Sequence, residues 1–173
     1  MNKLLLHGCC AECTIKFLGA IKGNEEIDEV AVFFYNPNIH PRSEYQSRLV
    51  AIKKVLEEKR VRLIVPDWRP KEYFEVVKNN KNRCKCCWLL RINKTWEWAV
   101  SSGFEQFSTT LLASQYQNRK VIEEMGNEVG KKGDSRFFVP KKIDQDLKTS
   151  GFYKQFFCGC VYSMQERFEE KYK

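Results

Sequence analysis

Cysteines supply most of the residues in this sequence that could do chemistry, and they fall into three groups. The eight cysteines are Cys9, Cys10 and Cys13, then Cys84, Cys86 and Cys87, and finally Cys158 and Cys160. Thiolates are ligands of zinc and of iron–sulfur clusters, and in a reducing compartment they are more often metal ligands or catalytic thiols than disulfides. About seventy residues separate one group from the next, so only the fold can bring the groups together.

A structural zinc site is one interpretation of these groups. Such sites use four ligands in pairs spaced C-x2–4-C, and the pairs Cys10–Cys13 and Cys84–Cys87 have that spacing. Four cysteines would then lack a role, and one small ion has no need of the adjacent Cys9 and Cys10. The pair Cys84–Cys87 could also be a redox-active dithiol, but this would leave the other two groups unexplained.

An iron–sulfur centre explains more of the cysteines. A [4Fe–4S] cluster takes four thiolates, often from distant segments of the chain, and the remaining thiolates could hold a second metal beside it. Adjacent cysteines suit that arrangement, because each centre can take one of the two side chains. Cys86 then remains as a spare thiol or as a small buried side chain.

The composition predicts a basic, soluble, single-domain protein. The 173 residues are enough for one hydrophobic core, so we expect one domain over 1–173. Lysine and arginine number 30 against 22 acidic residues; the net charge of +8 favours a polyanionic partner such as nucleic acid, although a lysine-rich solvated surface would give the same excess. No apolar run reaches about 20 residues and the N-terminus lacks the apolar region of a signal peptide, so we expect no membrane segment and a cytoplasmic location.

Strand and helix patterns alternate along the chain. Short apolar runs predict strands over 4–7, 30–35, 61–65 and 104–112. Helical spacing predicts helices over 13–22, 43–60, 89–100 and 117–129, one after Pro70 and a last one in the C-terminal tail, with a flexible charged connection over 126–134. The alternation is typical of a three-layer α/β domain with a mostly parallel sheet. Sites in such sheets form outside the carboxyl ends of the strands, so we expect the loops 7–13, 36–45, 67–68 and 110–118 to converge.

Five motifs, in order along the chain, resemble those of the cobalamin-independent epoxyqueuosine reductases, the QueH family. The motifs are His7-Gly8-Cys9-Cys10-Ala11-Glu12-Cys13; Tyr35-Asn36-Pro37-Asn38-Ile39-His40-Pro41 with Glu44, Tyr45 and Arg48; Arg83-Cys84-x-x-Cys87; Thr109-Thr110-Leu111-Leu112-x-Ser114; and Cys158-Gly159-Cys160-x-Tyr162-Ser163. They span nearly the whole chain. The sequence departs from the family pattern at Glu12, which replaces a proline, at Asp67-Trp68-Arg69, where Asp-Tyr-Asp is usual, and at Gln115, within the usual Ser-Pro-Tyr.

The resemblance implies an oxidoreductase that reduces epoxyqueuosine to queuosine at the wobble position of tRNA, the final step of queuosine biosynthesis. It implies a [4Fe–4S] cluster with an adjacent iron, and a Rossmann-like fold similar to that of the adenine-nucleotide α-hydrolases, or PP-loop proteins. The loop that binds phosphate in those proteins would here be rebuilt as a metal loop. Removing an epoxide oxygen as water takes two electrons and two protons, and a nearby iron could bind that oxygen as a Lewis acid.

The hypothesis gives a role to each residue of a candidate site. The cluster ligands are Cys10, Cys84, Cys87 and Cys158, and the ligands of the second iron are Cys9, Cys13 and Cys160. Asp67 is a further candidate ligand or proton donor, unless it caps the helix that follows Pro70. The candidate catalytic hydroxyls are Tyr116 and Tyr162, although either ring could simply pack. The candidate tRNA contacts are Arg42, Tyr45, Arg48, Arg83, Trp88 and Arg91.

Partners follow from the same hypothesis. Neither a flavin nor a nicotinamide motif is present, so we expect electrons from a reduced ferredoxin or flavodoxin, and we favour a monomer that binds tRNA. The alternative from another class is a non-catalytic, zinc-stabilised, basic RNA-binding module. A cysteine-dependent tRNA thiolase of the PP-loop type is disfavoured, because no Ser-Gly-Gly-x-Asp-Ser phosphate loop follows the first strand.

Overall fold

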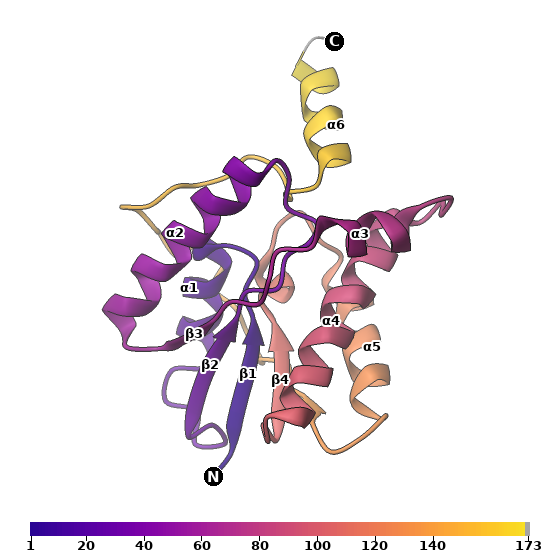
Figure 1. Cartoon of the computed structure of the whole chain (residues 1–173). Coiled ribbons are helices and arrows are strands. Elements are labelled where there is room, and N and C mark those ends of the chain that lie inside the picture. Colours follow the sequence, from indigo (N-terminus) through magenta and orange to yellow (C-terminus); the bar gives the residue numbers. More distant parts are fainter. Residues whose placement is uncertain (172–173) are drawn as a thin grey trace.

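The computed structural model describes residues 1–171 and shows an α/β fold built on one five-stranded sheet (Figure 1). The strands are β1 (Lys3–His7), β2 (Glu29–Phe33), β3 (Arg62–Ile64), β4 (Gln106–Thr109) and β5 (Arg136–Phe137). Their order is β3-β2-β1-β4-β5, and every neighbouring pair is parallel. The predicted three-layer, Rossmann-like fold with a mostly parallel sheet is therefore confirmed.

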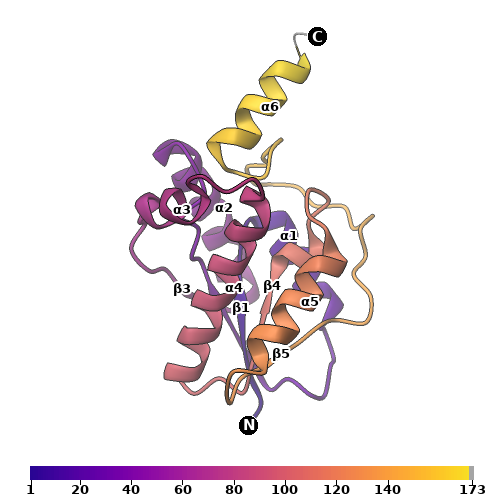
Figure 2. The same cartoon turned by 90° about the vertical axis from the view of Figure 1, so that its right-hand side faces the viewer.

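Helices cover both faces of the sheet, as the crossovers between parallel strands require. They are α1 (Ala11–Ala20), α2 (Arg42–Lys59), α3 (Pro70–Val77), α4 (Arg83–Ser101), α5 (Arg119–Gly130), α6 (Val161–Lys171) and a short 3-10 helix, η1 (Thr110–Ala113). Helix α1 packs on α2, and α4 packs on α5. Figures 1 and 2 show the sheet between these two pairs, with α6 standing away from the rest of the protein.

The central strand is buried on both faces, which explains its continuous apolar sequence. Leu4, Leu5 and Leu6 of β1 have no solvent exposure, because the layers of helices cover successive side chains on opposite faces of the sheet. Burial of this strand fixes the position of its carboxyl end, where His7 is also fully buried. The loop that follows His7 therefore begins from a rigid point in the core.

Three sequence predictions of secondary structure were wrong in part. The strand predicted over 104–112 ends at Thr109, where η1 begins. The connection predicted over 126–134 is helical as far as Gly130, and it leads to the unpredicted strand β5. Two residues are too few for an alternating pattern, and the strand is held by its parallel pairing with β4 and by the packing of Phe137 on Phe107. Helix α4 begins at Arg83 rather than near Leu89, so the cysteines of the second group lie on its first turns.

None of the helices in the described part of the chain is long and apolar enough to span a membrane.

Candidate metal centre

The first cysteine group lies at the start of α1, directly after the carboxyl end of β1. The sulfur atoms of Cys9, Cys10 and Cys13 all lie within 4.8 Å of one another, and all three residues are buried. Cys10 is the N-cap of α1, and its sulfur accepts a hydrogen bond from the backbone N–H of Cys13 at 3.4 Å. A helix N-terminus favours negative charge, so the position suits thiolates.

Side chains from η1, β2 and α2 hold this loop. The hydroxyl of Thr110 donates to the sulfur of Cys9 at 3.1 Å and accepts the backbone N–H of Cys9 at 2.9 Å. A side chain on Gly8 would place its Cβ 2.7 Å from Val32 and 2.8 Å from Ile52, so only glycine lets the loop pack this closely on β2 and α2. The loop geometry is therefore set by contacts from three other elements.

His7 orients the loop through hydrogen bonds rather than by offering a free nitrogen. Its Nε2–H donates to the backbone carbonyl of Tyr35 at 3.0 Å, and its Nδ1 accepts from the Thr109 hydroxyl at 2.9 Å. Burial, followed by the nearby charge of Arg91, lowers the pKa of His7 to about 4. The imidazole is therefore neutral at physiological pH, with both ring nitrogens already bonded within the protein.

The third cysteine group is held by the loop after β2 and by α2. The guanidinium of Arg48 donates to the backbone carbonyls of Phe157 at 3.0 Å and Cys158 at 2.8 Å, while its Nε pairs with Glu44 at 2.7 Å. The backbone N–H of His40 donates to the carbonyl of Gly159 at 2.9 Å. These bonds fix the Cys158-Gly159-Cys160 turn, in which the two sulfurs lie 3.9 Å apart.

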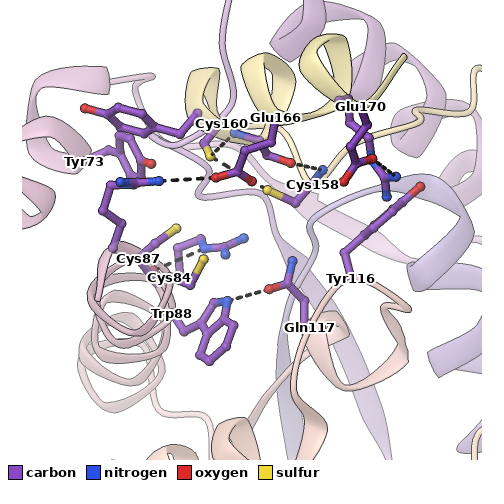
Figure 3. Close-up of a pocket in the computed structure, with 15 residues that line it drawn as sticks. Tyr73, Cys84, Cys87, Trp88, Tyr116, Gln117, Cys158, Cys160, Glu166 and Glu170 are labelled. Carbon is purple, nitrogen blue, oxygen red and sulfur yellow. Dashed lines mark hydrogen bonds and ion pairs between the residues drawn. The ribbon is translucent and has the colours of Figure 1, made fainter. Parts of the chain in front are cut away.

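The second and third groups face one another across a pocket (Figure 3). Cys84 and Cys87 rise from α4 toward Cys158 and Cys160 of the C-terminal segment, and all four residues line a cavity of about 220 Å³. Cys86 does not line it: its side chain lies in a separate groove between α3 and α4. Seven of the eight cysteines thus line the pocket or form the buried group at the same end of the sheet.

The pocket contains several of the other predicted residues. Tyr116, Tyr162, Trp88, Arg83 and Arg91 all line it. The guanidinium of Arg83 lies 4.3 Å from the ring centre of Tyr162, and the indole N–H of Trp88 donates to the side chain of Gln117 at 2.6 Å. An aromatic pocket with cationic groups at its edge suits a nucleoside.

Other predicted residues lie outside the pocket. Asp67 is exposed, pairs with Arg69 at 3.3 Å and lines a shallow surface depression together with Arg42 and Tyr45. It does not cap α3, whose N-cap residue Arg69 makes no side-chain capping bond. The structure therefore does not bring Asp67 to the cysteines, although its loop follows a strand of the same sheet.

Two of the arginines predicted to contact tRNA are buried. Arg48 is 2% exposed and its guanidinium is occupied by Glu44 and the C-terminal segment; Arg91 is 3% exposed. Neither suits a contact with a phosphate at the surface. The sequence prediction failed here because an arginine on an amphipathic helix is usually solvated, and the bonds made by Arg48 span about 110 positions of sequence.

Sequence reasoning also missed residues that the structure places in the site. Gln117, Tyr73, Glu166, Arg167 and Glu170 line the pocket without having been predicted. Thr110 belongs to one of the motifs, but nothing in its type indicated a bond to a cysteine. Glu166, Arg167 and Glu170 of α6 had no detectable signal, because the surface pattern of a helix does not reveal which pocket it borders.

The donor set fits a thiolate-bound metal. Three sulfurs within 4.8 Å of one another and four more cysteines around one cavity provide soft ligands from three distant segments. The described residues therefore have the donor atoms that a thiolate-bound metal centre requires.

Comparisons with known proteins agree with the motifs. The family model described as "Epoxyqueuosine reductase QueH" matches residues 4–166. A protein of Dehalococcoides mccartyi named "Epoxyqueuosine reductase QueH" is 38% identical over 96% of this chain and 94% of its own length. Proteins of the same name from Thermotoga maritima and Histophilus somni are 32% and 31% identical, over 98% and 95% of this chain and 94% and 73% of their own lengths. The chain belongs to the epoxyqueuosine reductase QueH family.

Proposed function

We propose that this protein is an oxidoreductase that converts epoxyqueuosine to queuosine at the wobble position of tRNA. The observation that carries the proposal is the convergence of seven cysteines, from three distant segments, at the carboxyl end of the sheet. The shared name of the relatives supports the same reaction. The reaction consumes two electrons and two protons and releases the epoxide oxygen as water.

The proposed cofactor is a [4Fe–4S] cluster with an adjacent iron. Ligands of one tetrahedral metal lie about 3.8 Å apart when each metal–sulfur bond is about 2.3 Å, and a [4Fe–4S] cluster takes four thiolates. The sulfurs of Cys9, Cys10 and Cys13 lie close enough to share a single ion. We therefore propose that these three hold the lone iron.

The four cysteines of the pocket would then hold the cluster. These are Cys84, Cys87, Cys158 and Cys160. Relative to the division expected from the sequence, Cys10 and Cys160 exchange roles. When bound, such centres supply electrons one at a time and a Lewis acid for the oxygen of the substrate.

The two divisions differ in a measurable way. With Cys10→Ala, the proposed division predicts loss of about one iron per chain while about four sulfides remain. Cys160→Ala is the matched variant and should lower the sulfide content instead. The opposite pattern of iron and sulfide would restore the division expected from the sequence.

The protein's own residues would bind and orient the nucleoside. The rings of Tyr116, Tyr162 and Trp88 offer stacking surfaces, and the first two also carry hydroxyl groups that can hold a proton near the pocket. The candidates for contacts with phosphate groups are Arg83 at the edge of the pocket and Arg42 on the surface depression. Asp67 lies outside the cavity, on the surface depression, so its role as a proton donor remains a prediction from the sequence.

The proposed partners are tRNA carrying epoxyqueuosine and a small electron carrier such as a ferredoxin or flavodoxin. The +8 net charge supports the first of these. The substrate implies that the protein acts in the cytoplasm, and we propose that it acts as a monomer.

Metal analysis of protein purified and reconstituted without oxygen tests the cofactor. The proposal predicts about five irons and four acid-labile sulfides per chain, with broad visible absorption near about 400 nm. One zinc per chain, without sulfide or colour, would contradict it and would favour a zinc-stabilised RNA-binding module.

A further inference from the structure

Arg91 is a buried cation without an acidic partner. Only 3% of its surface is exposed, and none of the ion pairs within residues 1–171 includes it. Its Nε–H donates to the backbone carbonyl of Cys87 at 3.3 Å. The equally buried Arg48 differs, because Glu44 balances its charge at 2.7 Å. A buried charge without a partner is costly, so its retention calls for a counter-charge.

Cysteines line the pocket around Arg91, and the two carboxylates that also line it, Glu166 and Glu170, pair with Arg83 and Arg167 instead. Arg91 lies one helical turn after Cys87 on α4 and lines the pocket with Cys84, Cys87, Cys158 and Cys160. Burial alone would lower the pKa of its guanidinium, but the neighbouring Cys87, Cys9 and Cys158 raise that pKa above its ordinary value. These three cysteines come one from each group. Arg91 therefore lies in the pocket between the second and third groups, and its charge also acts on Cys9 of the first.

We infer that Arg91 is the fixed counter-charge of the thiolate-bound metal centre and that it sets the reduction potential of that centre. The inference rests on the metal site in the proposed function. Thiolate ligands give such a centre a net negative charge, and each electron received from the carrier protein adds one more. A cation held in a low-dielectric pocket stabilises the reduced form more than the oxidised form, and so it raises the potential. Arg91 is a positioning and tuning residue rather than a catalytic one.

Potentiometric titration of the reconstituted protein, followed by visible absorption and electron paramagnetic resonance, tests this role. Arg91→Gln should shift the midpoint potential to a more negative value, whereas Arg91→Lys keeps the charge and should stay near the wild type. Arg83→Gln is the control, since it removes the same charge from the partly exposed edge of the same pocket. Its potential should change much less than that of Arg91→Gln.

Each outcome decides the inference. A metal-loaded Arg91→Gln protein with the wild-type potential would overturn it. If Arg91→Gln fails to fold or to load, Arg91→Lys carries the test: a folded Arg91→Lys protein that loads normally and keeps the wild-type potential supports the inference. One that loses its metal would show that the shape of the guanidinium matters rather than its charge. A wild-type protein that takes up neither iron nor sulfide would overturn both this inference and the proposed function.

Discussion

Cys86 and Cys87 lie on one helical turn but face different surroundings, so their substitution should have very different effects on turnover. Cys87 is buried at the pocket, whereas Cys86 lies in the groove between α3 and α4. Loss of a residue that only supports a metal ligand costs 10- to 100-fold, so Cys87→Ala should lower turnover by about 100-fold or more. Cys86→Ala, the matched control, should keep its iron, its sulfide and its turnover. Equal losses in both variants would contradict the placement of these two thiols.

Gly159 is a second position where a single substitution should disturb the site. Its φ of +129° disfavours any side chain, and a Cβ there would lie 3.1 Å from both Arg48 and Ile39. We expect Gly159→Ala to destabilise the protein by about 1–3 kcal/mol and to lower metal retention, because the turn carries Cys158 and Cys160. Gly23→Ala is the control: it has a positive φ of +75° but no crowding, and it lies past the C-terminal end of α1, whereas the cysteines of the first group lie at the N-terminal end. Urea unfolding and iron analysis of the two variants check this, and unchanged iron in Gly159→Ala would count against it.

Helix α2 anchors the C-terminal segment. Arg48 joins Glu44 to the carbonyls of Phe157 and Cys158 in a buried network. Breaking such a pair leaves Glu44 without its charge partner, so Arg48→Met should lower the free energy of unfolding by about 3 kcal/mol. Arg42→Met, on the exposed first turn of the same helix, should change that free energy by less than about 0.5 kcal/mol. Chemical denaturation of the metal-free protein measures both, and equal effects would refute the anchoring role.

The sequence predicts elements well where a pattern is local. The apolar run at Leu4–Leu6 and the helical stripe of α2 are visible in the chain itself, and so is the rule that loops after parallel strands converge. The arrangement of Arg48 and Cys158 is not visible, because it depends on a contact between segments about 110 residues apart. Asp67 shows the limit of the convergence rule: its loop follows a strand of the sheet, but its side chain points to the surface. The rule predicts where the loops lie, whereas the orientation of their side chains depends on packing.

The net charge of the whole protein predicts how its binding to tRNA responds to salt. A net charge of +8 favours association with a polyanion through release of counterions. If two or more phosphates are neutralised, affinity should fall at least about tenfold between about 50 and 200 mM salt. Fluorescence anisotropy with labelled tRNA measures this. Affinity that does not change over that range would show that the basic excess is only a solvated surface.

The conversion of epoxyqueuosine to queuosine can be measured directly on tRNA. Reconstituted protein, a chemical reductant and tRNA carrying epoxyqueuosine are incubated without oxygen, and the nucleosides are then analysed by mass spectrometry. Epoxyqueuosine should disappear and queuosine, lighter by one oxygen atom, should appear in equal amount, with Cys87→Ala protein as the inactive control. Protein that holds its full iron and sulfide yet leaves epoxyqueuosine unchanged under these conditions would contradict the account.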